Sequence, residues 1–182
     1  NILKDISFSI NENEILGLIG PNGSGKSTIM KCIAGLYHPT SGEITINGYD
    51  IDKDRVNALS NMGVSIEYPA LYPNLTGEDH FKMVAKWKKL DKSRIKEMED
   101  FSGLNDELKK EVRHYSMGMK QRLTLSLAMM TKPKLLILDE PTNGLDPQAI
   151  IDLRKKLLDI RNDGTSILLS SHQLSEVDKL VD

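Results

Sequence analysis

The stretch GPNGSGKST, residues 20–28, decides the expected fold. It matches the pattern G-x-x-x-x-G-K-[ST], and it stands between an apolar stretch at residues 15–19 and a helical pattern that begins at Ser27. Glycines let such a loop turn several backbone N–H groups toward one group of phosphate oxygens, and the helix amino terminus adds a favourable potential. That potential contributes only about 0.3–2 kcal/mol, so Lys26 must supply the full positive charge.

The same stretch also offers a metal ligand, because the hydroxyl of Ser27 is placed to bind Mg²⁺. The alternative is a glycine-rich turn that binds nothing, but the strand before the loop and the helix after it favour phosphate binding. The residues predicted to bind nucleotide phosphates are Gly20, Pro21, Asn22, Gly23, Ser24, Gly25, Lys26, Ser27 and Thr28.

A second polar site follows the buried aliphatic strand in LLILDEPTNGLDP, residues 135–147. Asp139 can hold Mg²⁺, directly or through water. Glu140 points elsewhere, because neighbouring strand residues face opposite ways, and it is placed to take a proton from an attacking water. The alternative is that the two carboxylates only cap the strand. His172 follows an apolar strand at residues 167–169 and two serines, where open parallel sheets place their ligands, although a lone histidine is more often a surface or core residue.

The order of strand and helix patterns predicts an α/β fold with a parallel sheet and a helical insert from about residue 68 to residue 132. We therefore expect one domain over residues 1–182, with residues 1–67 and 133–182 forming the α/β core. Strands are predicted at residues 2–10, 14–19, 43–46, 62–66, 134–139 and 165–172. Helices are predicted at residues 27–36, 77–90, 93–101, 116–130 and 147–163.

Composition excludes several other classes of protein. The net charge of −2 gives no overall attraction to nucleic acid or an anionic membrane, and the single cysteine, Cys32, allows no internal disulfide. The aliphatic run at residues 135–138 is far shorter than the ~20 residues of a membrane-spanning helix. The abrupt start at Asn1 and the end inside a helical pattern suggest a fragment trimmed at both ends.

With these motifs in order, the chain resembles the ATP-binding subunits of ABC transporters over essentially all of its 182 residues. The resemblance rests on the phosphate loop, a signature sequence in YSMGMKQR at residues 115–122, the strand that ends at Asp139, Glu140, a D-loop at residues 143–146, and His172. It implies a P-loop NTPase core of the RecA type, with a small antiparallel β part and an inserted α-helical subdomain.

The resemblance also implies a mechanism. Two such domains sandwich two ATP molecules head to tail, so that Ser116 and Gly118 of one copy face the γ-phosphate held by the other, with Ser116 also a good helix N-cap. His172 senses the γ-phosphate, Mg²⁺ accompanies ATP, and a membrane permease holds the pair at the cytoplasmic side of the membrane. The usual signature is Leu-Ser-Gly-Gly-Gln, so Met117 and Met119 are departures that we ascribe to helix packing.

Glu67, in GVSIEYPALYPNLTGED at residues 63–79, stands where most of the family has a glutamine that ligates Mg²⁺. A carboxylate is a suitable hard oxygen ligand, so we expect Glu67 to reach the metal when ATP is bound. The alternative is a solvated loop charge. This glutamate, PALYPNLT after it and YSMGMKQRL resemble the subunits of lantibiotic-immunity and bacitracin-resistance exporters.

Two rival functions remain open. One is a soluble ABC ATPase that acts on ribosomes or nucleic acid, although such proteins usually carry two cassettes or long coiled-coil arms, and we expect no nucleic-acid partner here. The other is an ATP-binding regulator without hydrolysis, against which Glu140 and His172 argue.

Overall fold

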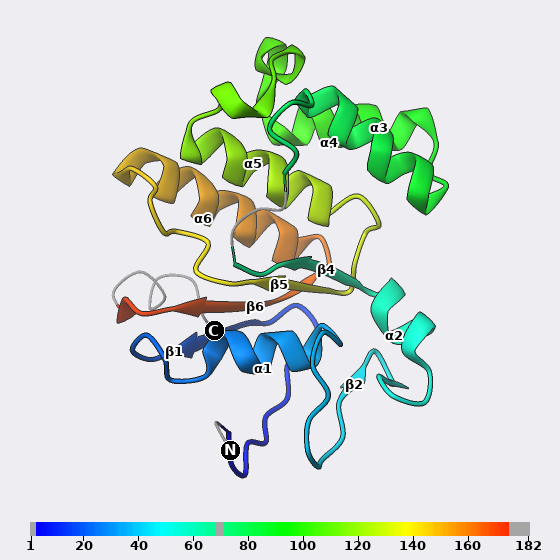
Figure 1. Ribbon diagram of the computed structural model, residues 1–182, viewed down its shortest axis with the longest axis vertical. Helices are drawn as coiled ribbons and strands as arrows, with labels where there is room; N and C mark the ends of the chain where they lie inside the picture. The colour runs from blue at the N-terminus through cyan, green and yellow to red at the C-terminus, as the bar shows by residue number, and fades with distance from the viewer. Residues whose placement is uncertain (1–2, 68–70, 175–182) are drawn as a thin grey trace.

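The computed structural model describes residues 3–67 and 71–174, and Figure 1 shows them as a layered molecule built on one parallel sheet. The strands of this sheet lie in the order β1-β6-β5-β4, and every neighbouring pair is parallel. Their bounds are β1 Ile15–Ile19, β4 Met62–Ser65, β5 Leu135–Leu138 and β6 Ser166–Ser171. The fold is therefore that of a P-loop NTPase core, as the sequence predicted.

The sheet is buried on both faces because its two central strands carry continuous aliphatic runs. Leu136 and Leu138 pack with Leu157 and its neighbours on α6, Pro147–Asn162, whereas Ile137 packs with Met30 of α1, Lys26–Ile33. Successive strand residues point to opposite faces, so one helix layer covers each side (Figure 1). The sequence places Leu153, Leu157 and Ile160 at i, i+4 and i+7, a spacing that predicts one apolar stripe, and the structure confirms that all three are buried in the core.

A small hairpin and a short helix lie beside α1. The hairpin joins β2, Thr45–Ile46, to β3, Tyr49–Asp50, in an antiparallel pair. Its two turn residues, Asn47 and Gly48, have φ values of 49° and 81°, as a two-residue turn with the twist of a hairpin requires. The short helix α2, Arg55–Ser60, was not predicted.

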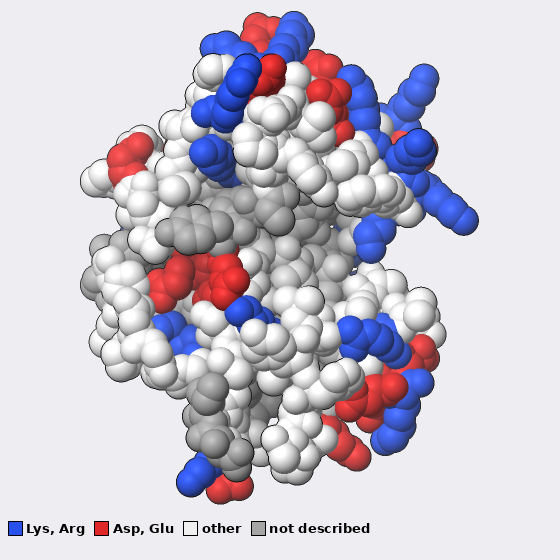
Figure 2. All heavy atoms as spheres, in the orientation of Figure 1, with Lys and Arg blue, Asp and Glu red and all other residues white. Residues whose placement is uncertain are grey.

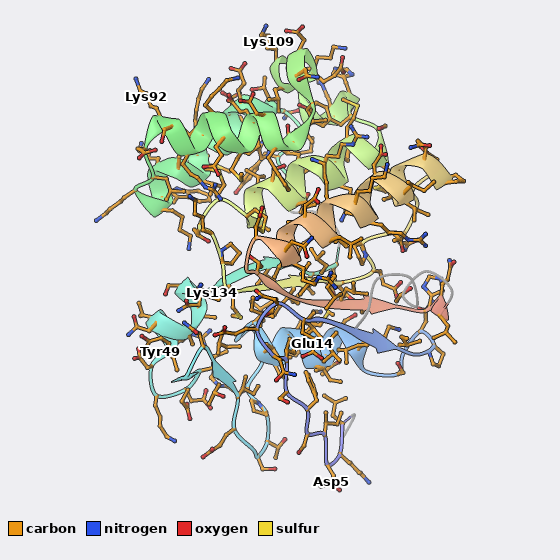
Figure 3. The ribbon with its side chains drawn as sticks, turned by 180° about the vertical axis from the view of Figure 1, so that it is seen from behind. Asp5, Glu14, Tyr49, Lys92, Lys109 and Lys134 are labelled. Carbon is orange, nitrogen blue, oxygen red and sulfur yellow. The ribbon has the colours of Figure 1, made fainter. Side chains whose placement is uncertain are left out.

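The helical unit expected between residues 68 and 132 forms the top of the molecule in Figure 1, although its expected start at residue 68 lies outside the described residues. Its members are α3 Gly77–Lys88, α4 Lys92–Ser102, η1 Asn105–Lys109, η2 Val112–His114 and α5 Met117–Ala128. Helix α5 joins this unit to the core, since Leu123 packs among the helices and Leu125 packs against the sheet. In Figure 3 the labelled Lys92 and Lys109 lie at this end and Asp5 at the other.

Two expectations are wrong. The strand predicted at residues 2–10 does not form over residues 3–10, where Asp5 has a φ of 50° that interrupts an extended chain and no sheet partner is present among the described residues. The helical spacing of Trp87 with Phe81 and Val84 in the sequence predicts that Trp87 lies in the core of the helical unit, but Trp87 is 64% exposed, whereas Phe81 is wholly buried. The two residues lie six positions apart on α3, about 240° around the helix, so they cannot share one face.

The sequence Thr76-Gly-Glu-Asp79 predicts a capping box at the start of α3, and the structure confirms it. The Thr76 hydroxyl accepts a hydrogen bond from the Asp79 N–H at 3.1 Å, and the Asp79 carboxylate accepts one from the Thr76 N–H at 3.1 Å. The hydroxyl and N–H donors of Thr76 hold the pKa of Asp79 below its ordinary value. The helical patterns at the carboxyl end of the chain beyond residue 174 lie outside the described residues.

Replacing Thr76 with alanine should therefore destabilise the fold by about 1 kcal/mol, measured by urea unfolding at pH 7, because an N-terminal donor of α3 loses its acceptor. The lowered pKa of Asp79 means that its contribution is present above the ordinary carboxyl pKa and is lost as the pH falls through the folded-state pKa. The difference between parent and variant should thus shrink in acid. Thr40→Ala, at an exposed threonine, is the control, and equal effects of the two changes would contradict the capping role.

Among the described residues, no helix combines the length and the apolar character needed to cross a membrane.

Candidate functional site

The phosphate loop joins β1 to α1 at the carboxyl edge of the sheet. Gly23 and Gly25 have φ values of 83° and 98°, in the left-handed region that glycine enters without a steric penalty. Gly25 is also the N-cap of α1 and brings no side-chain hydrogen bond to the helix start. The first N–H groups of α1 thus have no capping side chain in front of them, as a phosphate-binding helix start requires.

Lys26 is the first residue of α1, and only 8% of it is exposed. Its ammonium donates hydrogen bonds to the carbonyl oxygens of Gly20 at 2.7 Å and Pro21 at 3.2 Å, so the side chain folds back over the loop. The same Nζ atom lies 3.5 Å from Oε1 of Glu140. The predicted phosphate-binding lysine and the predicted general base therefore meet in the structure.

Asp139 follows the last residue of β5 and is held by the two neighbouring strands, β4 and β6. Its N–H donates to the Ser65 carbonyl at 2.9 Å, and its Oδ1 accepts a hydrogen bond from the Ser170 hydroxyl at 2.5 Å. The Ser170 hydroxyl also accepts the N–H of Glu140 at 2.9 Å, and Ser170 is fully buried. One buried serine thus holds both acidic residues in place. The sequence showed two serines before His172 but did not predict this role for either of them.

Glu140 turns away from the strand with a φ of 49°, a left-handed conformation that is uncommon for a residue other than glycine and recurs at functional sites. Its Oε2 lies 2.8 Å from Nδ1 of His172, and its side chain is 21% exposed. Lys26 and His172 thus contact the two oxygens of one carboxylate. Both of the residues predicted as catalytic, Glu140 and His172, come together beside the phosphate loop.

The ligand types at this edge fit Mg²⁺ better than a metal with nitrogen or sulfur ligands. Ser27 and Asp139 offer a hydroxyl and a carboxylate, and Mg²⁺ is usually held by one or two carboxylates together with substrate phosphates. Among the described residues, no three His, Cys, Asp or Glu side chains are grouped as a metal cage would need. The site therefore fits a metal that arrives with a nucleotide.

Glu67 follows β4 with a φ of 62°, and 61% of its side chain is exposed. Its Oε1 forms an ion pair and hydrogen bond with the ammonium of Lys31 on α1. The hydrogen bond from the Lys31 ammonium to Glu67 raises the pKa of Lys31. The structure thus brings Glu67 to α1, the helix that carries Ser27, through a lysine that the sequence analysis did not single out. The sequence did contain a signal for this lysine, because Ser27 and Lys31 are four residues apart and therefore share one face of the helix.

The signature residues lie at the start of α5. The Ser116 hydroxyl is the N-cap and accepts the Met119 N–H at 3.2 Å. A Cβ added at Gly118 would lie 3.7 Å from Ala149 of α6, and one added at Gly144 would lie 3.5 Å from the Met117 side chain. Ser116 and Gly118 are therefore placed beside α6 and the predicted D-loop.

The amino ends of α5 and α6 lie on the left of Figure 1, on the same side as the phosphate loop. Figure 2 shows acidic side chains gathered at mid-height on this side of the molecule, with basic side chains directly below them. The phosphate loop and the signature thus stand on one side of the molecule, in different layers.

Several known proteins are similar to this chain. The family model described as "ABC transporter" matches residues 3–143. The lantibiotic transport ATP-binding protein SrtF of Streptococcus pyogenes is 42% identical over all of this chain and 78% of its own length. The bacitracin transport ATP-binding protein BcrA of Enterococcus faecalis is 39% identical over all of this chain and 59% of its own length.

A solved structure of the ATP-binding subunit of an ABC transporter superposes with a TM-score of 0.89 at 35% sequence identity, covering all of this chain and 78% of the other. Several curated relatives are much longer, and the chain spans about 60% of their length.

Proposed function

The chain belongs to the ABC transporter family, and on that basis we propose that it binds ATP and hydrolyses it to power a transporter. The observation that carries the proposal is the meeting of three side chains at the phosphate loop. Lys26 lies 3.5 Å from one oxygen of Glu140, and His172 lies 2.8 Å from the other. A phosphate-binding cation, a carboxylate base and an orienting imidazole are the groups that hydrolysis of a γ-phosphate requires.

In the proposed reaction, Lys26 and the loop N–H groups bind the β- and γ-phosphates and neutralise their charge. Glu140 accepts a proton from the water that attacks the γ-phosphorus, while the bond between that phosphorus and the bridging oxygen breaks to give ADP and phosphate. His172, hydrogen bonded to the Glu140 carboxylate, holds the base and contacts the γ-phosphate. The buried Ser170 keeps the backbone of Glu140 in position.

Mg²⁺ would be held by Ser27 and Asp139, with Glu67 as a third ligand when ATP is bound. The metal, when bound, neutralises phosphate charge. Asp139 is kept in place for this purpose by the hydroxyl of Ser170 and by the backbone of β4. A carboxylate at Glu67 suits this ligand set, because oxygen ligands are what Mg²⁺ prefers.

The proposal places a second ATPase domain head to tail against this one. Gly118 and the exposed Ser116, at the start of α5, would contact the γ-phosphate held by the partner's phosphate loop. What supports this arrangement is that Ser116 lies at the start of a twelve-residue helix, where N–H groups and the helix dipole favour an anion.

The transported substrate is proposed to be a lantibiotic or a related peptide antibiotic, exported through a membrane permease to which the chain docks from the cytoplasmic side. Support comes from the names of relatives that cover the whole chain, a lantibiotic transport protein and a bacitracin transport protein. The net charge of −2 offers no general attraction to nucleic acid.

Deleting the gene in its host should increase sensitivity to lantibiotics or to bacitracin, and the parent gene should restore resistance. Glu140→Gln should not restore it, because binding without hydrolysis cannot drive repeated export. The protein should also sediment with the membrane fraction rather than with ribosomes. Restoration by Glu140→Gln equal to that by the parent, or sedimentation with ribosomes, would contradict transport powered by hydrolysis.

A further inference from the structure

Lys31 is a charged residue of the site that the proposed function leaves without a role. It lies four residues after Ser27 on α1, and residues at this spacing lie one above the other on the same helix face, one turn apart. Its ammonium pairs with the Glu67 carboxylate and lies 5.4 Å from the centre of the Tyr37 ring. The carboxylate of Glu67 is thereby held on the face of α1 that carries the predicted metal ligand Ser27.

The exposure of the pair is unequal. The Lys31 side chain is 18% exposed and lies over the Tyr37 ring, whereas the Glu67 side chain is 61% exposed and comes from a loop. The fixed partner is therefore the lysine, and the carboxylate is the one that it restrains. The ion pair involves Oε1 of Glu67. The other carboxylate oxygen can therefore bind a metal ion while Oε1 keeps its contact with Lys31.

A glutamate at this position also carries a charge that an amide would not. Beside a triphosphate, an unpaired carboxylate would repel the phosphates, and the cation of Lys31 offsets this charge. The ion pair between Lys31 and Glu67 thus reduces the repulsion between the carboxylate and the phosphates of a bound nucleotide.

We propose that Lys31 is a positioning residue for Glu67: it neutralises the carboxylate and keeps it within one helical turn of Ser27, ready to bind Mg²⁺ with ATP. The inference rests on the proposed role of Glu67 as a metal ligand. A surface ion pair without this role would link α1 to the loop but would leave the dependence of nucleotide binding on Mg²⁺ unchanged.

The test is a double-mutant cycle with Lys31→Met and Glu67→Gln, each placed in the Glu140→Gln protein so that ATP is not consumed. The measurement is the Mg²⁺ concentration that gives half-maximal binding of a fluorescent ATP analogue, followed by anisotropy. Lys31→Met should raise this concentration about two- to five-fold when Glu67 is present, the range that a part-exposed ion pair supplies. It should leave the concentration unchanged when residue 67 is glutamine.

Two controls separate positioning from charge and from folding. Lys31→Arg keeps an ion-pairing cation and should behave like the parent. Lys86→Met removes one positive charge from an exposed position on α3 and should have no effect. Thermal unfolding of each variant checks that α1 remains folded.

The outcomes distinguish failure of the positioning role of Lys31 from failure of the metal-ligand role of Glu67, on which it rests. If Glu67→Gln alone leaves the Mg²⁺ dependence unchanged, the negative charge of Glu67 has no part in binding the metal, and the positioning role of Lys31 fails with it. If Glu67→Gln changes the dependence but Lys31→Met does not, or if Lys31→Met acts equally in both backgrounds, only the role of Lys31 is overturned.

Discussion

ATP hydrolysis should fall by about 10²–10⁴-fold when Glu140 is replaced by glutamine, while ATP remains bound. The amide has nearly the shape of the carboxylate, so it can keep its neighbours Lys26 and His172, which lie 3.5 Å and 2.8 Å from the two carboxylate oxygens. It cannot accept a proton from water at neutral pH. The chemical step is therefore lost, whereas the phosphate loop and its lysine are unchanged.

The measurement is phosphate release at saturating ATP and Mg²⁺, together with ATP affinity. Glu12→Gln is the matched control, because it makes the same change at an exposed glutamate before β1 and should leave hydrolysis unchanged. Turnover of the Glu140 variant at the parent rate would show that another group is the base.

Replacing Lys26 with methionine should weaken ATP binding by about 10–150-fold, the loss expected when hydrogen bonds to a charged group are removed. The Nζ atom of Lys26 lies 2.7 Å from the Gly20 carbonyl oxygen of the phosphate loop, and the residue is buried. Methionine fills a similar volume without the charge, so the loop should stay folded.

The measurement is the affinity for a fluorescent ATP analogue at fixed Mg²⁺. Lys109→Met serves as the control: Lys109 lies at the far end of the helical unit, where it pairs with Asp106 (Figure 3). Equal affinities for the Lys26 variant and the parent would mean that the loop N–H groups hold the nucleotide without this lysine.

The parts of the fold that the sequence predicted are those in which local pattern and long-range packing agree. The phosphate loop has a specific motif, β5 has a continuous apolar run, and α6 has a periodic apolar stripe with a clear start at Asp146, whose side chain caps the helix. Such local features are enough to predict a helix, strand or loop even when the segments that pack against it are unknown.

The predictions failed where a neighbour decides the outcome. The alternation of apolar residues before Ile10 is typical of a strand, but a strand needs a hydrogen-bonded partner, and residues 3–10 have none among the described residues. The exposed position of Trp87 depends on which side of α3 meets the other helices. Pattern alone could not supply either fact.

Within the site, the sequence predicted the residues that are proposed to act on phosphate but not the residues that hold them in place. Ser170 and Lys31 carry no motif, and their roles appear only when β6 is placed beside β5 and when the loop after β4 meets α1. Glu67 was singled out because a carboxylate replaces an amide there, yet its partner could not be read from the sequence. Supporting contacts of this kind are set by topology.

The central claim is that ATP joins two copies of the domain, held by Lys26 of one copy and by Ser116 of the other. The direct measurement is the molar mass of the Glu140→Gln protein by light scattering after size-exclusion chromatography. With ATP and Mg²⁺ the mass should be twice that of one copy, and with ADP, or when Ser116→Arg is added, it should be that of one copy. A single-copy mass with saturating ATP and Mg²⁺ would contradict the claim.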